Sequence, residues 1–317
     1  MYELIIVGGG PAGIAAGIYA ARKKMKTLLI ADSFGGQSLV SAGIENWIGT
    51  KLITGYELAK NLEEHLRHFQ KDVDIWDGDR VNKIEPSFAP QGGASEGQGK
   101  FFVVTTKNGQ RAETKTILVC SGSRRRRLGV PGEDRLDGKG VAWCSICDAP
   151  FFGGKVVAVV GGGNAGLEAV IDLKAYASKI YILQRSEKLR GDPVTQEKVL
   201  AIPNLTVIYN ALTQEILGDS FVSGVRYKDA VSGEEKTLEV GGVFIEVGNL
   251  PNSDFVKDLV KLNDYNEVMV DCRTQKTSLE GIWAAGDVSD VLYKQNNISV
   301  GDAIRGVLNI FDYLHTR

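Results

Sequence analysis

The sequence of 317 residues contains little cysteine and histidine, with four residues of the first type and three of the second. Four cysteines are too few for a secreted domain that disulfides hold together. A zinc site needs about four ligands, and only Cys144 and Cys147 are close in sequence. The three histidines lie far from this pair, at His65, His68 and His315. We therefore expect neither a disulfide scaffold nor a metal site.

An excess of charge of one sign is also missing, since 37 basic residues face 39 acidic ones. A chain this close to neutrality has no general attraction for nucleic acid or acidic membranes. The uncharged run at residues 4–21 follows Glu3 instead of a basic segment, and its GGGP sequence would break a spanning helix. We expect a cytoplasmic protein that binds neither nucleic acid nor membrane.

Glycine is abundant, and it marks an internal repeat. The sequence YELIIVGGGPAG at 2–13 has a counterpart in GKVVAVVGGGNAG at 154–166. In both, G-x-G-x-x-G follows a β-branched run and opens a helical pattern, and a second apolar run comes later, at 27–32 and 179–184. One such motif is a weak signal, but two in the same context predict two dinucleotide-binding units. The predicted fold class is α/β, with two Rossmann-like domains.

The two units differ where the second strand ends. Asp32 stands there in the first unit, and a carboxylate at this point bonds the adenosine ribose of FAD or NAD. The second unit has Gln184 instead, followed by Arg185 and Arg190. Without the carboxylate a 2′-phosphate is not repelled, and guanidinium groups can bind it. The first site is therefore predicted to take FAD and the second NADPH, with NADH as the open alternative.

The sequence CSICD places Cys144 and Cys147 three positions apart, with Asp148 directly after them, in the segment that enters the second unit. A flavin can take a hydride from a nicotinamide and pass two electrons to a nearby disulfide. The adjacent carboxyl group could then donate and accept the thiol proton. We interpret the pair as a redox-active dithiol. Cys120 and Cys272 stand in apolar, strand-like sequence, and we expect both to be inert.

Other segments give weaker predictions. Residues 86–100, rich in Pro, Gly, Ser and Gln, indicate a long hairpin loop. The basic run Arg124–Arg127 is interpreted as a solvated loop, with docking of an acidic partner as the alternative. The C-terminal stretch predicts a helix. Its expected apolar face is Val300, Ile304, Val307, Leu308, Phe311 and Leu314.

With an FAD motif, CxxCD and an NADPH motif in this order, the chain resembles the low-molecular-weight thioredoxin reductases over essentially all its length. It is almost as similar to the disulfide reductase part of the alkyl hydroperoxide reductase flavoprotein. The resemblance implies a discontinuous FAD domain at 1–122 and 249–317, an inserted NADPH domain at 123–248 that carries the CxxC, and a homodimer. It also implies that Cys147 faces the flavin and that Cys144 attacks the partner disulfide.

The glycine turns and the resemblance together give the candidate cofactor residues. Those for FAD are Gly8, Gly10, Pro11, Ala12, Gly13, Asp32, Gly36, Gln37, Asn46, Gly286, Asp287, Lys294 and Gln295. Those for NADPH are Gly161, Gly163, Asn164, Ala165, Gly166, Arg185, Ser186 and Arg190.

Four stretches depart from the family pattern. Its His-Arg-Arg triplet is Gln184-Arg185-Ser186 here, which leaves NADH open as donor. Ala149 replaces the glycine of CxxCDG, and Lys294-Gln295-Asn296 replaces Arg-Gln-Ala. The turn Asn46-Trp47-Ile48-Gly49 lacks the family's proline, so this loop near the flavin is expected to lie differently.

Three functions follow from these patterns. In the first, NADPH reduces FAD, FAD reduces the Cys144–Cys147 disulfide, and the dithiol reduces thioredoxin or a related protein. In the second, the donor is NADH or ferredoxin and the partner resembles a peroxiredoxin or glutaredoxin. In the third, the chain is a flavin-binding redox sensor, although a sensor needs no second nucleotide site.

Overall fold

The computed structural model describes residues 1–40, 44, 46–87 and 101–315. The chain divides into two compact units, one made of residues 1–124 and 250–317 and the other of residues 125–249. These limits lie within two residues of those expected from the sequence. The chain passes between the units in β7 (Ser123–Arg125) and β16 (Asn249–Pro251), which pair with each other.

The first unit is built on a mixed sheet with the strand order β3-β2-β1-β6-β5-β4, and β17 also pairs with β6. Strands β1, β2, β3, β6 and β17 run parallel, whereas β4, β5 and β6 pair antiparallel. The strands are β1 (Tyr2–Gly9), β2 (Thr27–Phe34), β3 (Val73–Asp77), β4 (Val81–Pro86), β5 (Phe102–Thr106), β6 (Arg111–Val119) and β17 (Ile282–Ala284).

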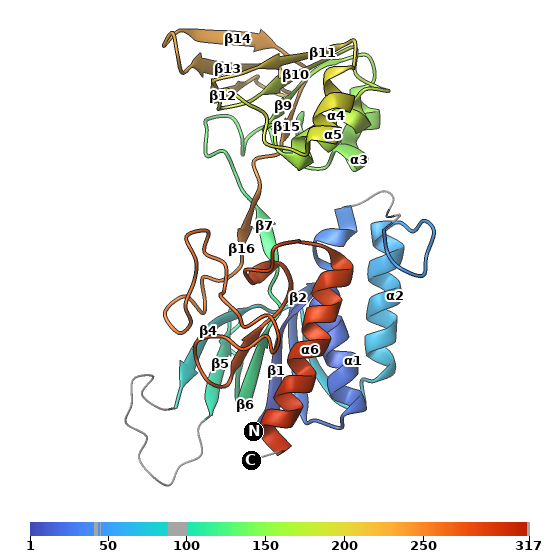
Figure 1. The fold of residues 1–317 in the computed structure, drawn as a ribbon, viewed down its shortest axis with the longest axis vertical. Coiled ribbons are helices and arrows are strands. Elements are labelled where there is room, and N and C mark those ends of the chain that lie inside the picture. Colours follow the sequence, from blue (N-terminus) through green and yellow to red (C-terminus); the bar gives the residue numbers. More distant parts are fainter. Residues whose placement is uncertain (41–43, 45, 88–100, 316–317) are drawn as a thin grey trace. The chain divides into compact units, whose positions relative to one another are not determined.

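Three helices cover one face of this sheet: α1 (Pro11–Arg22), α2 (Gly55–His68) and α6 (Asn296–His315) (Figure 1). Successive side chains of β1 point to opposite faces of the sheet, so the unit has a hydrophobic core on each face. Leu4 and Ile6 pack toward the helices, while Ile5 and Val7 pack toward residues 256–288 on the other face. Short 3₁₀ helices follow β2, at Gly36–Val40, and β17, at Gly286–Val288.

The C-terminal helix forms as predicted, and its predicted apolar face is right in part, since Val307 is buried and Phe311 and Leu314 pack against the core. The residues of α6 in the core are Ser299, Asp302, Ala303, Gly306, Val307 and Ile310, and Leu308 is exposed. The helix turns its small residues toward the core, because they allow α6 to approach α1 and the sheet closely. A Cβ at Gly306 would already lie 3.1 Å from a methyl group of Leu118.

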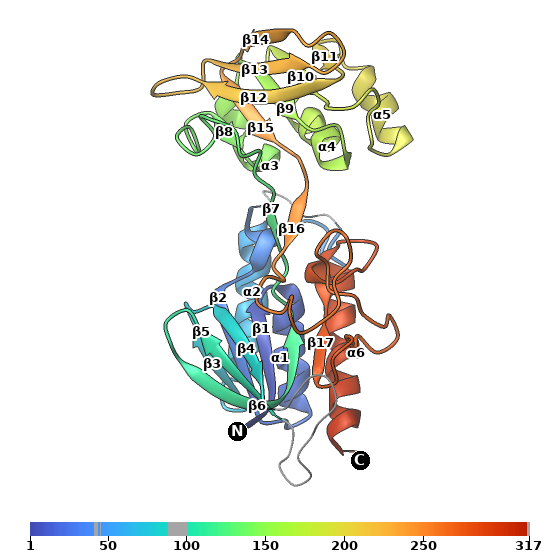
Figure 2. The ribbon, with the colours of Figure 1, turned by 90° about the vertical axis from the view of Figure 1, so that its left-hand side faces the viewer.

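The second unit repeats the parallel arrangement, with the strand order β11-β10-β9-β15-β8. Helices cover one face, and a small antiparallel sheet of β12, β13 and β14 lies on the other (Figure 2). The strands are β8 (Val141–Ala142), β9 (Val156–Val160), β10 (Lys179–Leu183), β11 (Leu205–Ile208), β12 (Ala211–Leu217), β13 (Gly224–Asp229), β14 (Glu235–Glu239) and β15 (Gly242–Ile245). The helices are α3 (Ser145–Asp148), α4 (Asn164–Leu173), α5 (Pro193–Leu200) and a 3₁₀ turn at Ala149–Phe152.

The two Rossmann-like units and the parallel sheets confirm the predicted α/β class. Strands β4 and β5 pair antiparallel on either side of the expected hairpin loop, of which residues 88–100 lie outside the described part. Within the described residues, none of the helices has the length and apolar character needed to cross a membrane.

Candidate functional site: two glycine turns, a cavity and a CxxC segment

The first glycine turn, between β1 and α1, has a clear steric basis. Gly8 has a φ of +117°, and a Cβ there would lie 2.2 Å from the carbonyl oxygen of Cys120. A Cβ on Gly13 would lie 1.8 Å from the carbonyl oxygen of Gly8. The chain's own backbone therefore requires both glycines. At Gly10 the nearest atom would be 3.9 Å away, so the protein itself does not exclude a side chain there.

The second glycine turn, between β9 and α4, follows the same rule. Gly161 also has a φ of +117°, and its Cβ would lie 2.1 Å from the carbonyl oxygen of Glu246. A Cβ on Gly166 would lie 1.9 Å from the carbonyl oxygen of Gly161, whereas one at Gly163 would meet nothing within 4 Å. In both turns, only the middle glycine leaves space that a ligand could use.

The helices that follow the two turns begin without a side-chain cap. Gly10 is the N-cap of α1 and Gly163 is the N-cap of α4, and neither can supply a side-chain acceptor for the first backbone N–H groups. Such N–H groups, at the positive end of a helix dipole, bind phosphate. Pro11 at the first position of α1 has a φ suited to starting a helix.

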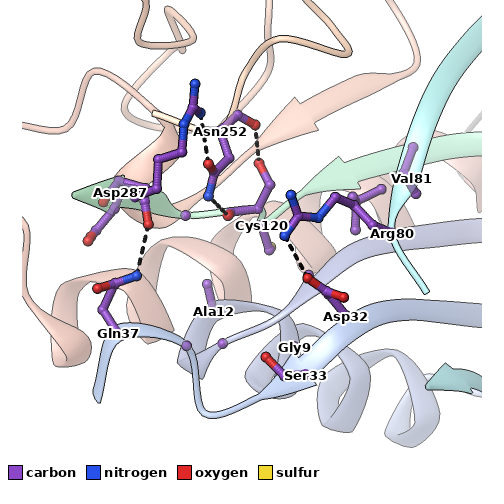
Figure 3. A pocket seen from close by; sticks show the side chains of 18 of the residues that line it. Gly9, Ala12, Asp32, Ser33, Gln37, Arg80, Val81, Cys120, Asn252 and Asp287 are labelled. Atoms are coloured by element: carbon purple, nitrogen blue, oxygen red, sulfur yellow. Dashed lines mark hydrogen bonds and ion pairs between the residues drawn. The ribbon is translucent and has the colours of Figure 1, made fainter. Parts of the chain in front are cut away.

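A cavity of about 790 Å³ opens beside the first turn, within the usual volume range of ligand pockets. Of the candidate FAD residues, those that line it are Gly8, Gly10, Pro11, Ala12, Asp32, Gly36, Gln37 and Asp287. Figure 3 shows Asp32 at one end of this pocket and Gln37 and Asp287 at the other. The sequence analysis missed a second group of lining residues, which includes Asp79, Arg80, Ser123, Asn252, Asn296 and Ser299.

At one end of the cavity Arg80 pairs with Asp32, with 2.6 Å between Nη2 and Oδ2 (Figure 3). Asp79 and Arg80 follow β3, next to β2 in the sheet, so the carboxyl ends of neighbouring parallel strands bring the pair together. This rule could have identified the GDR sequence after β3 as part of the site.

At the other end, Asp287 follows β17 and accepts a hydrogen bond from the Ser299 hydroxyl at 3.3 Å. Burial raises the pKa of Asp287, and Lys294 nearby lowers it in part. Gln37 donates through Nε2 to the carbonyl oxygen of Ser123 at 3.2 Å. Gly286, beside Asp287, has a φ of +75°, in the region that favours glycine.

Five candidate FAD residues are not among those that line the cavity: Gly13, Asn46, Gly286, Lys294 and Gln295. Gly13 lies in α1, against Gly8. Asn46 donates to the side chain of Gln295 at 3.1 Å, so these two bond to each other. Lys294 bonds Glu267 at 2.9 Å. Their contacts with a cofactor stay predictions.

In the second unit, Gln184 is buried and its side chain is fully engaged. Its Oε1 accepts from the N–H of Gly162 at 3.1 Å, and its Nε2 donates to Ser186 Oγ at 2.6 Å and to the Lys188 carbonyl at 2.7 Å. Gln184 therefore ties the strand end to the glycine turn. Ser186, a candidate phosphate contact, belongs to this network.

The remaining residues near the second turn present charge and amide groups. Arg185 and Arg190 are exposed, and the Arg190 N–H donates to the Gly162 carbonyl at 2.7 Å. The side chain of Asn164 accepts from the N–H of Asp192 at 2.7 Å. Ala165 is exposed in the first turn of α4. The backbone bond places Arg190 beside the turn at which a phosphate would bind.

The CxxC segment runs into the short helix α3. Cys144 is half-buried, and the Asp148 N–H donates to its carbonyl oxygen at 3.0 Å. Burial raises the pKa of Asp148, while a hydrogen bond from the Cys144 backbone and the charge of Arg125 oppose the rise. A carboxyl group with a raised pKa beside the pair is suited to hold and release a proton. Cys147 follows in the same helix.

The other two cysteines differ from each other. Cys120 is buried directly after β6, and burial raises the pKa of its thiol, so thiolate chemistry is disfavoured as expected. Cys272 is exposed in a turn, so the expectation of apolar, strand-like surroundings is wrong for this residue. Within the described residues, His, Cys, Asp and Glu side chains form no group of three or more that could hold a metal ion.

Three of the four arginines of the basic run pair with carboxylates of the chain itself, while Arg124, Arg126 and Arg127 are also exposed, as expected of a solvated loop. The ion pairs are Arg124 with Asp254, Arg125 with Glu246, and Arg127 with Asp134 and Asp137. Arg127 also stacks over Trp143, whose Nε1 donates to Asp137 at 2.8 Å. The run therefore helps to hold the segment that leads to Cys144.

Two dinucleotide-type turns on separate units, one of which also carries CxxCD, define the class of two-domain flavin- and nicotinamide-dependent oxidoreductases. Residues 2–303 match the pyridine nucleotide-disulphide oxidoreductase family, and the chain belongs to it. Such proteins are flavoproteins that couple a nicotinamide nucleotide to a disulfide.

Relatives and solved structures agree with this assignment. The chain is 44% identical over 314 residues to the F subunit of alkyl hydroperoxide reductase in Pseudomonas aeruginosa, covering 99% of this chain and 58% of that protein. It is 40% identical over 313 residues to a protein of Bacillus subtilis named NADH dehydrogenase, with the same two coverages. It thus spans about three fifths of the curated relatives it matches. The thioredoxin reductase of Lactococcus lactis superposes with a TM-score of 0.85 at 30% identity and covers all of both chains.

Proposed function

We propose that this chain is an NADPH-dependent disulfide reductase that binds FAD in the cavity of its first unit. Its redox-active pair would be Cys144 and Cys147, and its substrate the disulfide of thioredoxin or a thioredoxin-like protein. The observation that carries the proposal is the matched pair of glycine turns, one on each unit. In each turn the protein itself does not exclude a side chain at the middle glycine, and the second unit also carries CxxCD.

The residues around the first cavity fit FAD. The open space at Gly10 and the uncapped start of α1 suit a pyrophosphate. Asp32 offers a carboxylate for ribose hydroxyls, at the opposite end of the pocket from Gln37 and Asp287 (Figure 3). The residues that would hold the group therefore span the length of the cavity, as a long dinucleotide requires.

The side chains of the second unit favour NADPH over NADH. Gln184 is buried and its amide group bonds within the protein, so it is poorly placed to accept from a ribose hydroxyl. Arg185 and Arg190 are exposed cations beside it, and cations favour a 2′-phosphate. NADH remains the second candidate, because one relative is named NADH dehydrogenase.

When bound, FAD supplies the capacity to accept a hydride from the nicotinamide and to pass two electrons to the disulfide. The chain's own residues then complete the exchange. The Cys144 thiolate attacks one sulfur of the partner's disulfide, and the other sulfur leaves as a thiolate. Cys147 next attacks the Cys144 sulfur, which restores the internal disulfide and releases the reduced partner. Asp148, with its raised pKa, holds and returns the proton of the pair.

A thioredoxin reductase is among the structures that superpose on the whole chain, which supports a thioredoxin-like partner. The relatives named as F subunits of alkyl hydroperoxide reductase favour a second candidate, a peroxiredoxin system, but they are longer than this chain. We propose a homodimer in either case, and ferredoxin is a further donor to compare.

The experiment compares steady-state reduction of a purified thioredoxin and of a purified peroxiredoxin, with NADPH and with NADH as donors. We expect the highest kcat/KM for NADPH with thioredoxin, and loss of partner reduction in Cys144→Ser. If peroxiredoxin is preferred, the second candidate replaces the first. If neither nucleotide is consumed with any disulfide, a protein donor or a sensor role becomes the better account.

A further inference from the structure

The residue between the two cysteines is held from inside the protein. Ser145 begins α3, and its side chain is buried, with 8% of the residue exposed. Its Oγ donates a hydrogen bond to Oδ2 of Asp172 at 2.7 Å. A hydrogen bond to a carboxylate is short and stronger than one between neutral groups. The hydroxyl of Ser145 is thus engaged with Asp172.

Asp172 belongs to α4, the helix that starts at the second glycine turn. It lies near the C-terminal end of this helix, and α3 packs against α4. The segment has a second anchor, since the backbone N–H of Cys144 donates to the Asp148 carboxylate. Both the backbone and the side chain next to Cys144 are therefore fixed by carboxylates of the same unit.

The carboxylate of Asp172 also acts through its charge. Asp172 and Glu168, one turn apart on α4, both raise the pKa of Glu246 at the end of β15. Arg125 pairs with Glu246 at 3.5 Å and opposes the rise. The hydrogen bond to Ser145 and the charge near Glu246 are two separable effects. Asp172→Asn keeps an acceptor for Ser145 and removes the charge, whereas Ser145→Ala removes the bond and keeps the charge.

We propose that Asp172 is a positioning residue for the dithiol, which acts through Ser145 to hold the CxxC segment ready for disulfide closure. The inference rests on the proposed function, because it takes Cys144 and Cys147 as the redox pair. Two cysteines three positions apart meet more often when the backbone between them is held in a suitable conformation. An anchor that orders it in advance raises the effective concentration of one thiol at the other and so stabilises the disulfide.

The test measures this closure directly in glutathione buffers, with the full chain as purified and no nucleotide donor. In the step, the two thiols give two electrons and two protons to oxidised glutathione, whose S–S bond breaks as the Cys144–Cys147 bond forms, and two reduced glutathiones are released. The fraction of closed pair is measured by mass spectrometry of the peptide that contains residues 144–148, after the free thiols are blocked.

We expect Ser145→Ala and Asp172→Leu each to lower the equilibrium constant for closure about tenfold, or ~30 mV for a two-electron couple. Asp172→Asn should stay within about threefold of the wild type, because the acceptor remains. The double variant S145A/D172L should be no worse than either single one, because both remove the same bond. Ser232→Ala, in the turn between β13 and β14 of the same unit, is the matched control and should leave closure unchanged.

Unchanged closure in both Ser145→Ala and Asp172→Leu would overturn the positioning role and leave the proposed function intact. So would a shift in Ser145→Ala alone, since Asp172 would then have no part in it. If the wild-type pair does not close in any glutathione buffer, the dithiol itself is wrong and both proposals fall. A variant that merely unfolds is recognised by its far-UV circular dichroism, and Asp172→Ala, which also removes the acceptor of the hydrogen bond from Ser145 but adds no bulk, then replaces Asp172→Leu.

Discussion

Arg80 and Asp32 form an ion pair at one end of the first cavity, with 2.6 Å between Nη2 and Oδ2. Both side chains are more than half exposed, so the pair adds little to folding stability. The pair bears on ligand binding, because Asp32 stands where a carboxylate bonds adenosine ribose.

We predict that Asp32→Ala weakens FAD binding about tenfold or more, because a charged acceptor for ribose hydroxyls is lost. Arg80→Gln leaves Asp32 in place and should change the affinity by no more than about threefold. Both affinities follow from flavin fluorescence in titrations of flavin-free protein. Equal binding by Asp32→Ala and the wild type would remove Asp32 from the site.

The glycine turns give a second prediction. Gly10→Ala and Gly163→Ala should change stability by no more than about 1 kcal/mol, since neither Cβ comes closer than 3.9 Å to a neighbour and both φ angles, −76° and −87°, suit alanine. Each should nevertheless weaken one ligand, FAD for Gly10 and the nicotinamide nucleotide for Gly163.

The matched control is Gly8→Ala. Its Cβ would overlap the Cys120 carbonyl at a φ of +117°, so we expect a loss of more than about 3 kcal/mol and little folded protein. Thermal unfolding and ligand titration separate the two effects. A Gly10→Ala variant that binds FAD normally would show that the middle glycine does not serve the ligand.

Glu246 should make stability depend on pH. Burial raises its pKa from 4.5 to about 7, and Glu168 and Asp172 add to the rise while Arg125 opposes it. Between these two values the folded protein keeps a proton that the unfolded chain has released. The stability that this group contributes therefore falls as the pH rises through that window, and it stays lost above it.

Glu246→Gln removes this titration. Compared with the wild type, we expect similar stability near pH 5 and a gain on the order of 1 to 3 kcal/mol near pH 8, as one pKa unit is about 1.4 kcal/mol. Urea unfolding across the pH range checks both ends. A variant that is less stable than the wild type near pH 8 would mean that the ion pair with Arg125 outweighs the cost of burial.

Donor choice gives a further prediction. Arg185→Ala should raise the KM for NADPH about tenfold and leave that for NADH nearly unchanged, because only NADPH carries the phosphate. Arg126→Ala, an exposed arginine of the same unit, is the control. Steady-state rates with both nucleotides decide the matter, and an equal rise in both KM values would contradict a phosphate contact.

Local patterns allowed much of this architecture to be predicted from the sequence. The contacts of Gly13 with Gly8 and of Gly166 with Gly161 join residues a few positions apart, so the motif carries this part of the turn geometry. The buried face of α6 was predicted only in part, because Gly306 and Ala303 pack closely although neither is a large apolar residue. Periodicity of large side chains cannot reveal that kind of contact.

Contacts between distant segments could not be predicted in the same way. Asp172 and Ser145 are 27 positions apart, and Arg80 and Asp32 are 48 apart. Only the packing of α3 on α4 and the order of β2 and β3 bring these pairs together. Gln184 stands where a carboxylate would bond a ribose, but its hydrogen bonds to the glycine turn depend on the folded loop and could not be predicted.

The central claim is that electrons from the nucleotide reach the sulfurs of Cys144 and Cys147 through the flavin. Anaerobic titration of the purified protein with NADPH, followed by flavin absorbance, tests it most directly. The wild type should take up two molecules of NADPH per flavin, that is about four electrons, because the disulfide is reduced as well as the flavin. Cys147→Ser should take up only one. Equal uptake by the two proteins would contradict the account.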